Sequence, residues 1–210
     1  MNLDSAVPSK AQRTRDALRN AARTAFVQNG WAGTRVNDIT SLAQVSHGTF
    51  YTYYENREAV LDELISEVVT PLIDLAASPW RAQNPTDGLR SLIEAFLDVH
   101  VDAADILEVW RQASADQQRF AQSWTSVHKA FTSRIIQRLE GLARVVGTPC
   151  KPDAIQDTAE ILVSMVASHN LTTTQNVQSR QRVADAMMMI WGGAINQLLD
   201  APVIERPQMG

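Results

Sequence analysis

The sequence predicts an all-α protein, with an N-terminal three-helix helix-turn-helix domain and a larger helical C-terminal domain, about nine helices in all. Three observations support this fold class. Apolar residues recur every three or four positions along most of the chain, and no segment alternates as a half-buried strand would. The 210 residues include only 9 glycines and 8 prolines, which favours helices joined by short breaks. Hydrophobic residues make up 45% of the chain and charged residues 20%, which suits a folded core and argues against disorder.

The first predicted helix runs from Thr14 to Asn29. Gly30 is expected to end it, because glycine adopts the left-handed conformation at a helix end most easily. One face of this helix is apolar at a period of 3.6 residues, and another carries three arginines four residues apart. The apolar residues are Leu18, Ala22, Ala25 and Phe26, and the basic residues are Arg15, Arg19 and Arg23.

Three further helices are predicted from capping residues. Thr34 is placed to cap a short second helix that carries Val36, Ile39, Leu42 and Ala43. Residues 44–46 are too few for anything but a turn. Ser46 can cap a third helix from His47 to Tyr54, and Asn56 can cap a fourth, which Pro71 would kink or shorten.

Two short helices joined by a three-residue turn form a helix-turn-helix, with the first helix as support. The residues expected to interlock where the helices cross are Ile39, Ala43, Val45 and Phe50. The opposite side of the third helix is polar, which suits a helix that enters the major groove of DNA. Periodicity alone leaves an ordinary pair of amphipathic helices as an alternative.

Charge is unevenly distributed along the chain. Residues 1–57 hold seven basic and four acidic residues, a net charge of +3. The remainder holds 12 basic and 19 acidic residues, a net charge of −7, so the whole chain carries −4. A basic head on an acidic body is typical of a protein of which one end approaches phosphate. A solvated helix face accounts for the small excess equally well.

The segments from Gly33 to Ile39 and from Ala43 to Leu61 resemble the signature of the tetracycline-repressor (TetR) family of transcriptional regulators. Ala21, Ala22, Phe26 and Gly30 also stand where that family places them. The resemblance extends without gaps from Arg13 to Leu64. It implies a DNA-binding helix-turn-helix domain over residues 1–55 and a helical effector-binding and dimerisation domain over residues 56–210.

The resemblance also assigns DNA contacts residue by residue. Arg57 replaces the lysine usual in the family and would place a guanidinium fork on phosphate. Phe50 and Tyr54 fall on the packing side. Gln44 stands where glycine is frequent, at a cost of roughly 1 kcal/mol if the turn is left-handed. The residues expected to contact operator DNA are Thr34, Arg35, Ser46, His47, Gly48, Thr49, Tyr51, Thr52, Tyr53 and Arg57.

Beyond residue 76 the sequence is helical but less specific. Residues 89–100 and 106–110 carry apolar stripes, a long helix is expected over 116–146, and 147–152 form a loop. Two helices follow over 153–173 and 179–199. The family resemblance implies that these last two pair with their symmetry mates in a homodimer, and packing within one chain is the alternative for each apolar residue.

The middle helices offer an apolar set with a few polar groups, which is typical of a small-molecule site. The family resemblance implies a repressor, and we predict that a small apolar or amphipathic effector releases it from its operator; an activator, or a regulator without an effector, is the alternative. Ordinary core packing is the competing interpretation of each residue. The set is Phe96, His100, Trp110, Trp124, His128, Phe131, Met165 and His169.

Other classes find little support. The four histidines lack the spacing of a metal site, and no glycine-rich phosphate loop or Gly-x-Ser-x-Gly motif is present. Cys150 lies in a loop without a recognisable base, so we expect an inert thiol. We expect no enzyme activity, no cofactor and no metal. Without a signal peptide or an apolar run of membrane length, a cytoplasmic protein is expected. A helical adaptor that has lost DNA binding is a further alternative.

Overall fold

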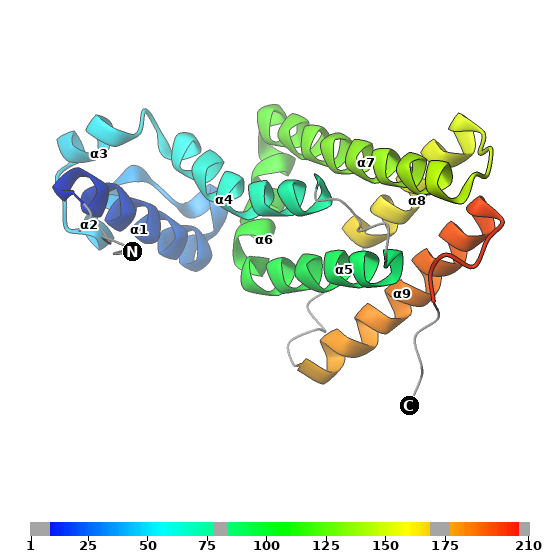
Figure 1. The fold of residues 1–210 in the computed structure, drawn as a ribbon. Coiled ribbons are helices and arrows are strands. Elements are labelled where there is room, and N and C mark those ends of the chain that lie inside the picture. Colours follow the sequence, from blue (N-terminus) through cyan, green and yellow to red (C-terminus); the bar gives the residue numbers. More distant parts are fainter. Residues whose placement is uncertain (1–8, 78–83, 169–176, 206–210) are drawn as a thin grey trace, which may run out of the picture. The chain divides into compact units, whose positions relative to one another are not determined.

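The computed structural model describes residues 9–77, 84–168 and 177–205, and every regular element in them is an α-helix. This confirms the predicted fold class and, for the described residues, the number of helices (Figure 1). The helices are α1 Lys10–Gly33, α2 Val36–Ala43, α3 His47–Tyr53, α4 Arg57–Ala77, α5 Pro85–Asp102, α6 Ala104–Asp116, α7 Gln118–Val146, α8 Pro152–Ser168 and α9 Val177–Leu199.

The described residues form two compact units. The first holds residues 9–67 and 105–121, and the second holds the rest. Helices α4 and α7 each contribute to both units, while nearly all of α6 belongs to the first. A boundary between functional domains after residue 55 stays a prediction.

Helix α1 begins four residues earlier than expected, because Ser9 Oγ accepts a hydrogen bond of 3.1 Å from Gln12 N and caps it. Gly30 interrupts the helix with φ 68°, a conformation that glycine adopts without a steric penalty. One further helical turn then carries Trp31, so the expected end at Gly30 is a kink inside α1.

The start of α2 differs from the prediction. Thr34 does not cap it: the helix begins at Val36, and Arg35 N donates to Asp38 Oδ2 at 2.8 Å. The Thr34 hydroxyl turns the other way and lies 2.8 Å from Gly30 O and 3.0 Å from Ala25 O. A threonine at this place can satisfy either the new helix or the end of the previous one, and here it satisfies the latter.

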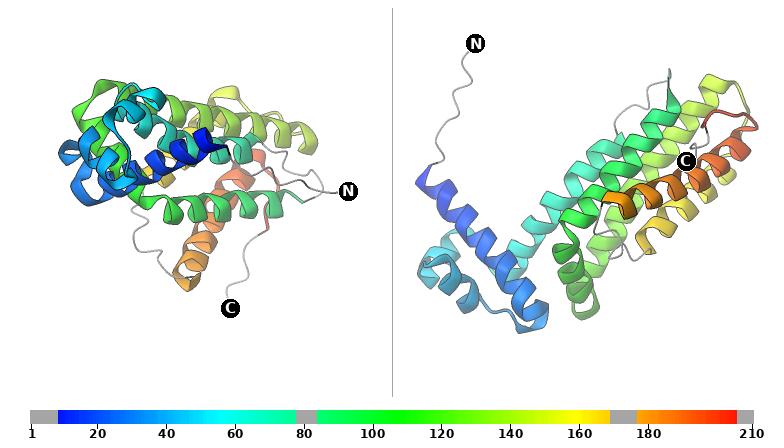
Figure 2. Two further views of the ribbon diagram at one scale, coloured as in Figure 1. Left: turned by 90° about the vertical axis from the view of Figure 1, so that its left-hand side faces the viewer. Right: turned by 90° about the horizontal axis from the view of Figure 1, so that it is seen from below.

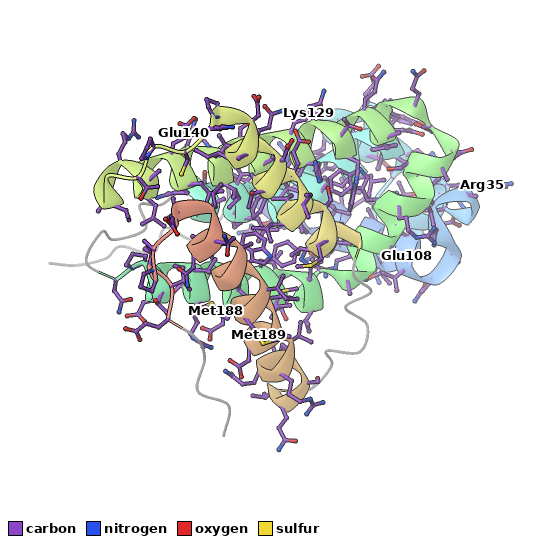
Figure 3. The ribbon with its side chains drawn as sticks, turned by 90° about the vertical axis from the view of Figure 1, so that its right-hand side faces the viewer. Arg35, Glu108, Lys129, Glu140, Met188 and Met189 are labelled. Carbon is purple, nitrogen blue, oxygen red and sulfur yellow. The ribbon has the colours of Figure 1, made fainter. Side chains whose placement is uncertain are left out.

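The second unit has its own apolar core, built by α5, α7, α8 and α9 with the end of α4. In it α9 packs against both α5 and α8, and Figure 2 shows these helices packed as a bundle. Neighbouring residues on α9 separate its two faces (Figure 3): Met188 is buried in the core, whereas Met189 is 53% exposed. Pro71 lies inside α4, which continues through it.

Candidate nucleic-acid interface

The turn between α2 and α3 has the predicted geometry. Gln44 is left-handed, with φ 54° and ψ 42°, and Val45 N donates to Thr40 O at 3.1 Å. Ser46 Oγ accepts from Thr49 N at 3.1 Å, which confirms Ser46 as the cap of α3. Phe50 is fully buried, so the apolar side of α3 is fixed against the rest of the first unit.

The opposite side of α3 is open to solvent. Tyr51 is 58% exposed, and His47, Gly48 and Thr52 are exposed as well. Thr49 and Tyr53 are half-buried beside them. A Cβ at Gly48 would meet no protein atom closer than 3.8 Å, so the packing of the protein itself does not require a glycine there.

Helix α2 and the residue that precedes it add two polar side chains to this surface. His47 Nε2 lies 3.1 Å from Asn37 Oδ1, which joins the start of α3 to α2. Asn37 is exposed and is absent from the set that the sequence predicted, although its place on the polar side of a short amphipathic helix is a usable signal. The exposed Arg35 side chain projects away from the ribbon (Figure 3). We call this surface the α3 face: Arg35, Asn37, Ser46, His47, Gly48, Thr49, Tyr51, Thr52 and Tyr53.

Two residues expected to contact DNA point into the protein instead. Thr34 is completely buried, and its hydroxyl is committed to α1. The Arg57 side chain is 21% exposed, and its Nη1 donates to the carbonyl oxygens of Trp31, at 2.7 Å, and Thr34. Their surroundings argue against the phosphate roles expected for these two side chains.

The arginine stripe of α1 is also committed within the first unit. Arg15 Nη2 lies 2.7 Å from Glu63 Oε2, and Arg19 Nη1 lies 2.8 Å from Glu67 Oε1. Arg23 forms a two-armed pair with Asp105 of α6, at 2.7 and 2.8 Å. The basic excess of the first 57 residues therefore overstates the positive charge that this unit can offer to phosphate.

Part of the predicted effector set does come together in the second unit. The Phe96 and His100 ring centroids lie 3.9 Å apart, and the Phe131 ring lies 6.3 Å from that of Phe96. Burial lowers the pKa of His100 below its ordinary value, which favours the neutral form of its ring. His100 Nδ1 lies 3.0 Å from Phe96 O, so Nδ1 carries the proton and Nε2 is left as an acceptor.

The rest of the set is scattered. Trp110 is buried in the first unit, where its Nε1 donates to Phe120 O at 3.3 Å. Trp124 is 37% exposed, and His128 Nε2 lies 3.4 Å from Ser164 Oγ of α8. Met165 lines a hollow of about 310 Å³ between α8 and α9. His169 lies outside the described residues.

Two further properties concern the described residues as a whole. Within 9–77, 84–168 and 177–205, no helix is long and apolar enough to cross a membrane. The same residues contain no group of three or more histidine, cysteine or acidic side chains arranged to hold a metal ion. Cys150 is a free thiol, half-buried, and its Sγ lies 3.3 Å from Leu198 O.

A buried support, a capped third helix and an exposed polar face define the first unit as a helix-turn-helix of the DNA-binding class. Residues 18–64 match the family model described as bacterial regulatory proteins, tetR family. The resemblance to tetR-family transcriptional regulators is thereby confirmed, and the match lies in the helix-turn-helix region of the chain.

Two known bacterial proteins are similar to this chain in sequence. The Tn10 transposon TetC protein of Escherichia coli is 26% identical over 89 residues, which are 42% of this chain and 45% of TetC. The regulator UidR of Escherichia coli K12 is 25% identical over 138 residues, 62% of this chain and 67% of UidR. These alignments thus cover between about half and two thirds of each relative.

Solved structures extend the likeness in fold to most of the chain. SmeT, described as the repressor of a multidrug efflux pump of Stenotrophomonas maltophilia, superposes with a TM-score of 0.68 at 16% identity. That match covers 96% of this chain and 98% of SmeT. A structure of SmeT in complex with triclosan gives a TM-score of 0.67 at 21% identity, over 90% of this chain and 91% of SmeT.

Proposed function

We propose that this chain is a transcriptional repressor that binds operator DNA through the α3 face. The observation that carries the proposal is the contrast between the two sides of α3: Phe50 is fully buried, while polar side chains and Gly48 stand exposed on the other side. A backbone without a side chain at Gly48 lets α3 approach bases or phosphate closely. Arg35 supplies a cation beside this surface.

Selection of DNA tests this proposal. The full chain is incubated with a random duplex library long enough for two half-sites, and bound duplexes are recovered and sequenced. We expect a two-fold symmetric sequence, bound with an affinity that falls steeply with salt. Arg35→Gln should reduce the slope of log affinity against log salt by about 0.9 for each protomer. Recovery of no preferred sequence would refute the proposal.

An operator with two half-sites requires two DNA-binding domains, and we propose that they come from a homodimer formed through α8 and α9. Ile161 on α8 is 68% exposed, and Met189 and Ile190 on α9 are exposed too. A Cβ at Gly193, one turn further along α9, would meet no atom within 4 Å. An exposed apolar surface beside Gly193, where no atom of the same chain is close, would let a helix of a second copy pack closely against α9.

The effector we propose is a small molecule with an apolar body, bound by the second unit. Phe96 and Phe131 offer ring surfaces, and the neutral His100 offers Nε2 as an acceptor for a hydroxyl or amide group. SmeT, whose fold is similar, has been solved with triclosan. Thermal-shift screening, followed by competition with the selected duplex, tests the idea. It fails if every stabilising compound leaves DNA affinity unchanged.

A further inference from the structure

Trp31 is the centre of a set of contacts inside the first unit. It is 1% exposed, and its ring packs edge-on against Phe120, with centroids 5.3 Å apart. Its Nε1 donates to Asp116 Oδ2 at 3.0 Å, and its backbone N donates to Gln112 Oε1, also at 3.0 Å. The end of α1 is thereby held by α6 and by the start of α7.

Arg57 approaches the same residue from α4. Its guanidinium carbon lies 4.1 Å from the centroid of the Trp31 ring, within the range of a cation–π contact. Nη1 places its two hydrogens on Trp31 O and Thr34 O. Nε lies 3.5 Å from Glu58 Oε1, so a carboxylate also compensates the charge.

The positions of these bonds in the chain give them a consequence for α2 and α3. Thr34 precedes α2, and Arg57 is the first residue of α4, so the two flank the whole helix-turn-helix pair. The bond from Arg57 to Thr34 O joins the two ends of this segment across 23 residues. Trp31 then ties the joined ends to α6 by hydrogen bonds and to the start of α7 by its ring contact with Phe120.

We propose that Arg57 and Trp31 are positioning residues, which clamp the two ends of the α2–α3 segment and so fix the orientation of the α3 face for sequence-specific DNA binding. The inference rests on the proposed function of that face. It replaces the phosphate contact that the sequence predicted for Arg57, because that side chain's Nη1 hydrogens, ring contact and charge are engaged inside the protein.

A phosphate contact and a clamp differ in three measurable ways. Loss of a phosphate contact weakens all duplexes alike and lowers the salt slope by about 0.9 for each protomer. Loss of a clamp weakens the selected duplex, leaves a shuffled duplex unaffected and leaves the slope unchanged. Lysine keeps the charge and substitutes well in a phosphate contact, but it lacks the planar guanidinium that stacks on the Trp31 ring while its Nη1 donates to two carbonyl oxygens.

The test uses the full chain with Arg57→Gln, Arg57→Lys and Trp31→Phe, and Arg35→Gln and Arg35→Lys as matched controls at an exposed arginine. Fluorescence anisotropy gives the affinity for the selected and shuffled duplexes over a salt series, with the active fraction fixed by stoichiometric titration. We expect all three clamp variants to lose about tenfold or more on the selected duplex alone, and Arg57→Lys to rescue nothing.

Each other outcome decides the question as well. A salt slope lowered by about 0.9 for each protomer in Arg57→Gln, restored by Arg57→Lys, would overturn the clamp in favour of a phosphate contact. Unchanged affinity in the variants would overturn it too. If the Arg57 variants do not fold, Trp31→Phe decides, because it keeps an aromatic ring at this position but loses the Nε1 bond to Asp116 and part of the ring surface that Arg57 contacts. Failure of the wild-type protein to prefer the selected duplex would instead refute the proposed function.

Discussion

At the scale of single residues, similar side chains have opposite roles in the first unit. Arg35 is exposed, whereas Arg57 is held by two carbonyl oxygens. Thr52 is exposed, whereas Thr34 is completely buried. Residue type and motif position do not separate the members of these pairs. The hydrogen-bond partners distinguish them, and the partners of Arg57 lie 23 and 26 positions earlier in the chain.

Gly30 gives a test of the kink in α1. Alanine there must adopt φ 68°, and its Cβ would lie 3.1 Å from Gln112 Oε1. We expect Gly30→Ala to lower the free energy of unfolding by about 1–2 kcal/mol in urea denaturation. Gly33→Ala is the matched control, with its Cβ in ordinary contact with Asn29 Cβ at 3.4 Å, and we expect almost no loss. Equal losses in both variants would argue against a special backbone at Gly30.

Local features were predictable from the sequence and distant ones were not. Ser46, Asn56 and Gln44 have the predicted roles because each is decided by bonds within a few residues: Ala59 N, for example, donates to Asn56 Oδ1 at 2.8 Å. The inward turn of Thr34 depends on the kink at Gly30, and that of Arg57 depends on Trp31. No spacing rule reveals such contacts.

At the scale of elements, α6 and the start of α7 fold with the first unit. The pairs Arg23–Asp105 and Trp31–Asp116 connect α1 to residues more than 80 positions away. Periodicity predicted an apolar stripe over residues 106–110, but it gave no partner for Asp105. Its actual partner is an arginine of α1, and only the tertiary structure brings the two together.

The contact between α1 and α4 predicts a dependence of stability on pH. Burial alone would raise the pKa of the Glu63 carboxyl, but hydrogen bonds and charge from Arg15, with the charge of Arg19, hold it below 4.5. A lowered folded-state pKa stabilises the fold above pH 4.5, and this contribution is lost as the pH falls through the folded-state value. Because the Arg15 side chain is half exposed, we expect the ionised Glu63 carboxylate to contribute less than about 1 kcal/mol to the free energy of unfolding.

Urea denaturation of the wild type and Glu63→Gln across this pH range measures the effect. The variant should be less stable near neutral pH, and the difference should shrink toward zero in acid. The exposed pair of Arg111 and Glu108 within α6 supplies the control, and Glu108→Gln should change stability less. A difference for Glu63→Gln that stays constant with pH would show that the ionised carboxylate is not what stabilises the contact.

At the scale of the whole molecule, the proposed homodimer makes opposite predictions for two adjacent glycines. A Cβ at Gly193 has no neighbour within 4 Å, whereas one at Gly192 would lie 2.8 Å from Ile204 Cγ2 of the same chain. We expect Gly193→Arg to leave the protomer folded and to abolish the dimer in light scattering. Gly192→Ala should destabilise the protomer itself. A Gly193→Arg protein that stays dimeric would exclude this face as the interface.

The family and the helical fold could be predicted from the segment between Arg13 and Leu64, because cap, turn and packing residues there follow one another without gaps. The effector site could not. Trp110 belongs to the first unit and Phe96 to the second, although both stand on apolar stripes of neighbouring helices. A helical stripe shows which side of a helix is buried, and it does not show against which partner.

The central claim is that the α3 face reads DNA, and the most direct test removes two of its exposed side chains. The double variant His47→Ala/Tyr51→Ala is compared with the wild type, by fluorescence anisotropy, for affinity to the selected duplex. Val145→Ala, an exposed change in the second unit, is the control. We predict an unchanged circular dichroism spectrum and an affinity at least about tenfold lower, approaching that for a shuffled duplex. A double variant that binds the selected duplex as tightly as the wild type would contradict the claim.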